Sequence, residues 1–202
     1  MHRFVYLASQ SPRRAQLIEQ LGIAHRPLLP ALRENAERLE EERPDEAPVD
    51  YVRRVTLAKL LAARTRLHTR GLPEAPILTA DTTVAAGRRI LGKPRDAADA
   101  AATLRLLSGR WHQVHTAVAV SHGRESLLAL STSRVRFAAL SERVIDQYIA
   151  SGEPFGKAGA YAIQGPISAW IERIDGSYTG IMGLPLFETR ELLARARVQA
   201  SP

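Results

Sequence analysis

The 202-residue sequence predicts one domain of the α/β class that contains a mixed β-sheet. Apolar stretches of strand length alternate with segments of helical periodicity along the chain, as is typical of this class. In the middle of the chain, residues 113–121 and 127–137 alternate like long strands and resemble a hairpin. These observations favour a mixed sheet over a purely parallel one.

The chain is expected to begin with a strand, a polar turn and a helix. Residues 4–8 form an apolar run of strand length. Ser11 followed by Pro12 is typical of a helix N-cap and first helical residue, and Gly22 of a helix end. This arrangement would direct backbone N–H groups and a helix dipole toward whatever lies in the turn.

The later elements follow the same alternation. Residues 77–80 are an apolar strand that we expect to end at Asp81, and residues 84–91 resemble a hairpin that turns at Gly87. Residues 27–48 are polar and punctuated by proline, which indicates a surface excursion. Further helices are expected over residues 49–68, 96–107, 141–149 and 184–195, and further short strands over residues 160–163 and 169–174.

The charge of the chain suits an anionic partner. Its formal net charge is +7 and its pI about 10.3, which fits nucleic acid or a small polyanion such as a triphosphate, although a generally arginine-rich composition would explain the same values. Acidic residues outnumber basic ones over residues 31–50, which argues against a duplex-binding surface. We therefore expect no nucleic-acid partner.

Composition also limits the location and the metal chemistry. The chain has no cysteine, so any metal would be held by oxygen or imidazole ligands. No apolar run approaches the roughly 18 residues of a membrane span. The apolar stretch at the N-terminus stops at Ser9 and basic residues follow, unlike a signal peptide. These features predict a cytoplasmic protein without a membrane partner.

Residues 9–14 are the first candidate for chemistry. Two serine hydroxyls, a helix N-terminus and the guanidinium groups of Arg13 and Arg14 together provide the dense set of donors that a triphosphate needs. An ordinary N-capped helix with exposed arginines would give the same pattern.

Asp81 is the second candidate, because ligands of α/β sheets bind beyond the carboxyl ends of strands. Its carboxylate could hold a divalent cation whose bound water becomes the nucleophile, or could orient and deprotonate that water directly. A cap at a strand-to-turn junction is the alternative.

Two further segments carry polar residues among small ones. Lys93 lies between Gly92 and Pro94 and supplies a point charge. Gln164 ends a small-residue segment, and its amide complements the adjacent carbonyl and N3–H of uracil or thymine. A tight strand entry with a solvated glutamine is the alternative. The histidines lack metal-ligand spacing, and His112 and His115 are expected to be structural.

Together these motifs occur in an order that resembles the Maf-like nucleoside triphosphate pyrophosphatases. The resemblance covers about residues 7–193 and rests on residues 7–14, 80–82, 92–94, 107–110, 157–165, 176–178 and 183–186. It implies a two-lobed fold similar to that of the inosine triphosphate pyrophosphatases, with two lobes that share a central mixed sheet across residues 1–202. The active site would lie in the cleft between the lobes.

The resemblance also implies the reaction. A nucleoside triphosphate would be cleaved between the α and β phosphates, with Mg²⁺ or Mn²⁺ as cofactor, in a protein that forms a homodimer. Asp81 would be the catalytic base, and Arg13, Thr82 and Gln164 would set the substrate specificity. The residues around Gln164 are similar to the dTTP/UTP branch rather than the 7-methyl-GTP branch, which implies house-cleaning of pyrimidine triphosphates, modified ones included, and a link to septum formation.

Phosphate and metal ligands follow from the same comparison. Ser9, Arg13, Arg14, Lys59 and Lys93 would bind the phosphates. Where the family has an acidic pair after the first helix, this chain has residues 32–34, so Glu34 is expected to hold the metal with Asp81, and Glu37 competes with it.

Two departures from the family pattern are Ala58 before Lys59 and Gly156 before Lys157. They leave open a catalytically impaired nucleotide-binding regulator in place of the enzyme. The sequence also leaves open a 7-methyl-GTP pyrophosphatase and, because of its high pI, a nucleic-acid-binding module.

Overall fold

A computed structural model describes residues 1–31, 34 and 36–199. Within these residues, a seven-stranded mixed sheet has the order β2-β1-β3-β5-β6-β7, and β4 pairs with β3 beside this path. Strand β1 runs parallel to β2 and β3, and the other pairs are antiparallel. The mixed α/β sheet predicted from the sequence is therefore confirmed. The strands are β1 (Val5–Leu7), β2 (His25–Pro27), β3 (Ile77–Ala86), β4 (Arg89–Leu91), β5 (Trp111–His122), β6 (Glu125–Phe137) and β7 (Ile171–Asp175).

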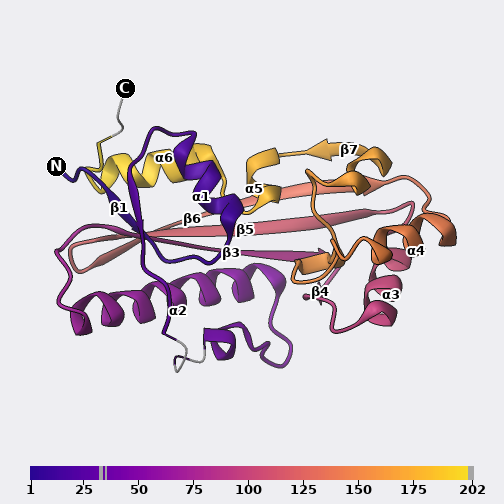
Figure 1. The fold of residues 1–202 in the computed structure, drawn as a ribbon, viewed down its shortest axis with the longest axis horizontal. Helices are drawn as coiled ribbons and strands as arrows, with labels where there is room; N and C mark the ends of the chain where they lie inside the picture. The colour runs from indigo at the N-terminus through magenta and orange to yellow at the C-terminus, as the bar shows by residue number, and fades with distance from the viewer. Residues whose placement is uncertain (32–33, 35, 200–202) are drawn as a thin grey trace.

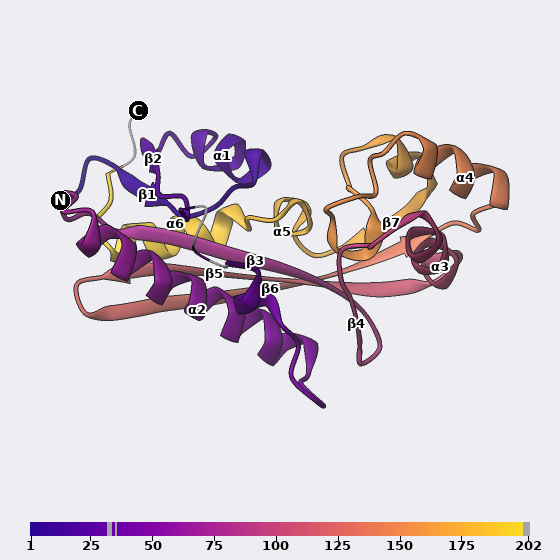
Figure 2. The ribbon, with the colours of Figure 1, turned by 60° about the horizontal axis from the view of Figure 1, so that its bottom comes forward.

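Helices cover both faces of the sheet (Figure 1). Figure 2 shows α2 along one face and α1, α5 and α6 on the other, while α3 and α4 lie together at the far end of the long strands. No helix of the described chain is both long and apolar enough to cross a membrane. The α-helices are α1 (Pro12–Glu19), α2 (Pro48–Thr69), α3 (Ala97–Leu107), α4 (Glu142–Ala150), α5 (Tyr178–Met182) and α6 (Leu186–Arg195), and the short 3₁₀ helices are η1 (Ala36–Glu40), η2 (Ala158–Ala160) and η3 (Pro166–Trp170).

The apolar core divides along the long strands. One set of buried side chains joins β1, α1 and α6 on one face, and another joins β1, β3 and α2 on the opposite face. A third set fills the far end, where α3 and α4 pack with Phe137 and Ile167. Strands β5 and β6 run the length of the sheet, from the end that holds β1, β2 and α2 to the far end that holds α3 and α4 (Figure 1). The helices at both ends therefore pack on one shared sheet.

Two local predictions were wrong, and one strand was missed. Strand β3 does not end at Asp81 but continues to Ala86, because its later residues pair with β4 and β5. Residues 160–163 are not a strand, since Gly159 and Ala160 adopt positive φ angles of 69° and 59° that interrupt an extended backbone. The edge strand β2, which ends where the predicted polar excursion begins, was not predicted from the sequence.

Candidate active site

The site lies at a gap in the sheet edge. On the side of β3 opposite β5, β1 pairs with β3 only as far as Leu78, and β4 pairs with it only from Val84 onward. No strand of the described chain lies beside residues 79–83 on that edge. The stretch that carries the candidate acid is therefore an open edge in the middle of a long, well-supported strand.

Strand alternation directs neighbouring side chains of this stretch to opposite faces. Asp81 points toward α2, where it contacts Lys59, whereas Thr82 points toward α1 and α5, where it contacts Arg14. Because the edge between them is open, both side chains line one cavity of about 580 Å³. Its other walls include residues 8–14, 39–40, 42, 90–93, 155–158 and 181–183.

An ion-pair chain forms the first wall of the cavity, which we call the ionic wall and define as Asp81, Lys59, Glu40 and Lys93. The ammonium of Lys59 donates to Asp81 Oδ1 at 2.6 Å and to Glu40 Oε1 at 2.8 Å. Lys93 donates to Glu40 Oε2 at 2.8 Å. Two carboxylates from η1 and β3 thus converge on one cation held by α2.

Electrostatics keep this wall charged. Burial raises the pKa of Glu40, but the attraction and hydrogen bonds of Lys59 and Lys93 outweigh it and lower that pKa to about 2. The neighbouring Tyr51 donates its hydroxyl to the Glu40 carbonyl oxygen, and burial followed by the charge of Asp81 raises its pKa. The tyrosine is therefore a neutral donor, and the Glu40 carboxylate is an acceptor at neutral pH.

The second wall, which we call the hydroxyl wall, consists of Arg14, Thr82 and the Gly183 carbonyl at the cavity, together with Thr116 and the Gly180 carbonyl behind Thr82. Arg14 Nε donates to the Gly183 carbonyl at 2.7 Å, and its Nη2 donates to Thr82 Oγ1 at 3.2 Å. Gly183 has a φ of 120°, a conformation that glycine tolerates and side chains disfavour. Burial lowers the pKa of Arg14, against the opposing charge of Asp81.

The polar turn itself differs in one detail from the prediction. Ser11 and Pro12 do occupy the N-cap and first helical positions of α1, but the Ser11 side chain makes no capping hydrogen bond. Instead Ser9 Oγ accepts from the Ser11 backbone N–H at 3.2 Å and from Arg14 Nη1 at 3.4 Å. Ser9 therefore shapes the turn, and the N-terminus of α1 faces the cavity.

Arg13 and Lys157 are cations of the cavity that form no ion pair within the described residues, unlike Arg66, which also lines the cavity but pairs with Glu34. Arg13 makes no side-chain hydrogen bond or ion pair within the described part of the chain. Lys157 donates to the carbonyl of Glu153, and burial followed by the nearby charge of Arg13 lowers its pKa. Two cations that repel each other across a cavity favour an anion between them.

Glu34 lies elsewhere than the sequence comparison implied. Its carboxylate accepts from Arg66 at 2.6 Å and from the Ala31 backbone N–H at 3.0 Å, and these hydrogen bonds lower its pKa to about 2. The acid that the structure brings to Lys59 and Asp81 is Glu40. Glu37 and residues 32–33 lie outside the residues whose side chains are described.

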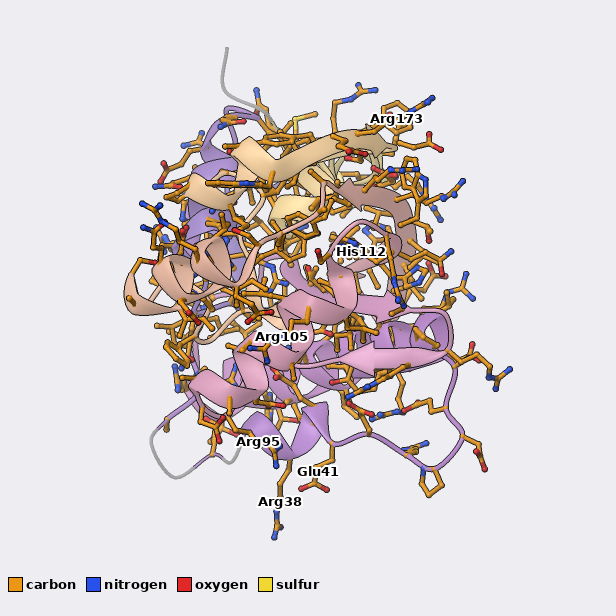
Figure 3. The ribbon with its side chains drawn as sticks, turned by 90° about the vertical axis from the view of Figure 1, so that its right-hand side faces the viewer. Arg38, Glu41, Arg95, Arg105, His112 and Arg173 are labelled. Atoms are coloured by element: carbon orange, nitrogen blue, oxygen red, sulfur yellow. The ribbon has the colours of Figure 1, made fainter. Side chains whose placement is uncertain are left out.

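Sequence reasoning missed Glu40 because it lies in a run of acids, residues 40–42, with no periodic pattern to distinguish them. The 3₁₀ helix η1 determines which of these carboxylates faces the cavity. Glu40 hydrogen-bonds to Lys59, whereas Arg38 and Glu41 project outward (Figure 3). The sequence also gave no separate indication that Lys157 would line the cavity. The small residues around it, which permit close packing against Val84, were the available signal.

Two other predicted positions can be placed. Gln164 is exposed in the turn before Gly165, and the cavity lining, as far as the structure describes it, includes Ile163 but not Gln164. His112 is buried behind the cavity, where its Nε2 lies 2.8 Å from the hydroxyl of Tyr161 (Figure 3). Burial lowers the pKa of His112 to about 4, so it is neutral and part of the core.

A mixed α/β sheet with carboxylates, a helix N-terminus and several cations around one cavity defines an α/β protein with a site for a polyanion. Comparison with known proteins gives the family. A family model described as "Maf-like protein" matches residues 4–196, and the chain belongs to this family.

Curated relatives align over almost the whole chain. A protein named "dTTP/UTP pyrophosphatase" from Albidiferax ferrireducens is 58% identical over 193 residues, 96% of each chain. Proteins of the same name from Burkholderia pseudomallei and Polaromonas sp. are each 59% identical, covering 96% of this chain and 94% and 96% of their own.

Proposed function

We propose that this protein hydrolyses dTTP and UTP, and modified pyrimidine triphosphates of the same shape, to the nucleoside monophosphate and pyrophosphate. The observation that carries the proposal is the meeting of Asp81, the N-terminus of α1 and the cations Arg13 and Lys157 in one cavity. The names of relatives that are 58–59% identical support the choice of substrates.

Asp81 is the catalytic residue of this proposal. Water attacks the α-phosphorus, the bond from that phosphorus to the oxygen bridging to the β-phosphorus breaks, and pyrophosphate leaves. Asp81 orients the water and accepts its proton, while Lys59, already hydrogen-bonded to the carboxylate, keeps its position fixed. Arg13 and Lys157 stabilise the negative charge that builds on the phosphate oxygens.

A divalent cation, Mg²⁺ or Mn²⁺, fits the donor set of the ionic wall. Asp81 and Glu40 offer oxygen ligands that already converge on one positive charge, that of Lys59. The described residues contain no group of three or more acidic or imidazole side chains that would hold a metal alone, so phosphate oxygens would complete the shell, as is usual for Mg²⁺. When bound, the cation would supply charge stabilisation to the phosphates.

Phosphate and base contacts are then divided along the cavity. Arg13 and Lys157 are available to phosphate, whereas Arg14, Lys59 and Lys93 first have to exchange or share protein partners. Thr82 lies at the open edge and can contact the nucleotide. Base reading by Gln164 stays a prediction, and it requires the turn before Gly165 to approach the cavity when a nucleotide binds.

One assay separates this function from the regulator, the 7-methyl-GTP enzyme and the nucleic-acid-binding module. It measures pyrophosphate release from a panel of dTTP, UTP, CTP, GTP, ATP and 7-methyl-GTP, with Mg²⁺, with Mn²⁺ and with chelator. We expect metal-dependent turnover that is highest with dTTP and UTP. Binding of UTP without turnover would instead indicate the impaired regulator, and selective turnover of 7-methyl-GTP the other branch. Steeply salt-dependent duplex binding without turnover would indicate the nucleic-acid-binding module.

The biological setting follows the same proposal. We expect a cytoplasmic homodimer that removes pyrimidine triphosphates, and a link to septum formation by resemblance to the family. Exposed apolar side chains such as Leu57 and Leu61, one helical turn apart on α2, and Phe187 on α6 are compatible with self-association. Light scattering coupled to size exclusion would measure the oligomeric state.

A further inference from the structure

An exposed aromatic side chain lies at the cavity. Phe155 is 40% exposed and lines the cavity beside Lys157. Single exposed apolar side chains are common on protein surfaces, but one at the mouth of a ligand site is a candidate contact for the ligand. The other large apolar side chains that are exposed in the described part of the chain all lie outside the cavity lining, and they are Met1, Leu29, Leu57, Leu61, Leu72, Tyr178 and Phe187.

Three aromatic rings line the cavity as described, and two of them are already committed to protein partners. Tyr161 is buried and packs edge-on against the ring of His112, with 5.4 Å between the ring centroids. Tyr51 is buried too, and the guanidinium of Arg54 lies over its ring at 5.4 Å. Phe155, the third ring, forms no aromatic pair or cation–π contact with any described residue. Its ring therefore remains available to a ligand.

The turn after α4 holds this ring in place. The backbone N–H of Glu153 donates to Ser151 Oγ at 3.2 Å, and the backbone N–H of Phe155 donates to the Gly152 carbonyl at 3.4 Å. Gly152 and Gly156 adopt positive φ angles of 75° and 73°, which bend the chain before and after the ring. The exposure of Phe155 is therefore set by a hydrogen-bonded turn, so a ligand meets a ring whose backbone is already ordered.

The chemistry of the ring decides which part of a nucleotide it suits. The face of a phenyl ring carries negative potential and repels phosphate, for which Arg13 and Lys157 provide the charges. A phenyl ring also offers no hydrogen bond to ribose hydroxyls, which lose free energy when they are buried without partners. The base is the planar part of the nucleotide, and its face matches an aromatic ring.

We propose that Phe155 is the stacking platform for the nucleobase. This inference rests on the proposed function and adds a base-binding residue that belongs to neither wall. Every base has a π face, so stacking strengthens the binding of all nucleotides without choosing among them. Selection of uracil and thymine then comes from polar groups elsewhere in the site.

The test removes the ring and compares probes with and without a base. Each probe is a triphosphate in which a methylene group replaces the oxygen between the α- and β-phosphorus, so the proposed reaction cannot cleave it. Calorimetry with Mg²⁺ measures the dissociation constants of the UTP analogue, the ribose 5-triphosphate analogue and the bare triphosphate analogue. In Phe155→Ala the UTP analogue should bind at least about fivefold more weakly, whereas the two base-free probes should stay within about twofold of the unmodified protein.

Three patterns would overturn the proposal. An equal loss for all three probes places the effect on the phosphate site. A loss shared by the UTP and ribose 5-triphosphate analogues, but absent from the bare triphosphate, places the sugar on the ring. An unchanged affinity for the UTP analogue removes Phe155 from the site altogether.

Phe187→Ala is the matched control, because it removes the same side chain from α6, where it is 70% exposed and outside the described cavity lining. The affinity for the UTP analogue relative to the bare triphosphate should not change in this variant. A fall in that ratio as large as in Phe155→Ala would also overturn the proposal, since the effect would then not depend on the position of the ring.

Phe155→Trp gives a direct signal of stacking. The larger ring should keep the affinity for the UTP analogue, and a base stacked on the indole should quench its fluorescence, whereas the base-free probes should not. Trp111 and Trp170 lie outside the described cavity lining, so the unmodified protein supplies the background. Equal quenching by all three probes would contradict stacking.

The proposed function is tested separately with the unmodified protein. If it releases no pyrophosphate from UTP, the proposed function fails, whatever the calorimetry shows. An active protein whose affinity for the UTP analogue ignores Phe155 refutes only this inference.

Discussion

The ionic wall and the hydroxyl wall start from adjacent residues of one strand yet are built from opposite chemistry. Asp81 begins a chain of four charged groups in which each contact is an ion pair. Thr82 begins a row that ends on the backbone carbonyl of Gly180, with the Arg14 guanidinium as its only charge. Strand alternation at an open sheet edge is sufficient to place both walls on one cavity.

This difference in chemistry implies that the contacts of the ionic wall can rearrange, whereas those of the hydroxyl wall are fixed. Lysine ammonium groups are flexible point charges that can exchange one oxygen partner for another, so the ionic wall can admit a cation or a phosphate oxygen. The hydroxyl wall is anchored on the backbone carbonyls of Gly180 and Gly183, which accept from Thr116 and Arg14. We infer that the first wall serves the chemistry and the second serves recognition, and the following predictions test that division.

The largest effect is expected from Asp81→Asn, which keeps the size of the side chain but removes its basicity. Pyrophosphate release from UTP should fall by at least about 10²-fold, the lower range for a positioned acid–base group, while UTP binding is retained. The measurement is kcat by pyrophosphate release, with the UTP dissociation constant from calorimetry.

Asp146→Asn is the matched control, because Asp146 is exposed on α4, away from the cavity lining that the structure describes. Its kcat should equal that of the unmodified protein. Near-normal turnover in Asp81→Asn would remove Asp81 from the catalytic role and leave the ionic wall as a binding surface.

The second comparison, Glu40→Gln with Glu34→Gln, decides which acid belongs to the ionic wall. Glu40→Gln should raise the Mg²⁺ concentration needed for half-maximal activity by at least about tenfold, since it removes a carboxylate that converges with Asp81. Glu34→Gln should instead lower the free energy of unfolding by about 1–3 kcal/mol, because it leaves the charge of Arg66, whose side chain is 7% exposed, without its carboxylate. The reverse pattern would restore Glu34 as the metal ligand.

A smaller effect is expected from Arg13→Gln, which removes a cavity cation that neither wall engages. The KM for UTP should rise about tenfold, the loss of one charge-assisted contact to phosphate, while the free energy of unfolding stays within about 0.5 kcal/mol. Arg143→Gln, an exposed arginine on α4, controls for the change in net charge. If both variants raise KM equally, the effect is one of overall charge and Arg13 is not a phosphate ligand.

Much of the fold could be predicted from local patterns. Pro12 begins α1, Asp96 and Ser141 cap α3 and α4 with their side chains, and Gly87 turns the β3–β4 hairpin, all as the sequence indicated. The edge strand β2 was missed because its three residues are mostly exposed and carry no apolar alternation. Its pairing depends on β1, a tertiary contact that short-range patterns do not encode.

The site could be predicted only in part, for a related reason. Asp81, Thr82, Arg13 and Arg14 lie in or beside regular elements, so their positions follow from the strand and helix that carry them. Glu40 lies in a long polar connection, where only the three-dimensional path of the chain decides which carboxylate turns inward. Thr116 gave no signal either, because a buried threonine in a strand has the same pattern as any other core residue.

The smallest expected effect is a difference in acid sensitivity between the walls. The folded pKa of Glu40 is about 2, below its ordinary value of 4.5, so the folded state binds fewer protons than the unfolded state between these values. The stability that Glu40 contributes is therefore fully present above about pH 5 and is lost as pH falls toward 2. The pKa of Glu34 is also lowered to about 2, so the stability that Glu34 contributes is lost over the same pH range.

Urea unfolding at pH 5 and pH 3 would measure how much of the pH-dependent free energy of unfolding comes from the ionic wall. Glu40→Gln should lose about 1–2 kcal/mol less free energy of unfolding between these pH values than the unmodified protein, because the contribution of the Glu40 carboxylate is absent. Thr116→Val should lose as much as the unmodified protein, since no group of the hydroxyl wall titrates in that range. If Glu40→Gln and the unmodified protein lose stability in parallel, Lys59 and Lys93 do not hold Glu40 ionised in solution, and the charges of the ionic wall are less fixed than its geometry indicates.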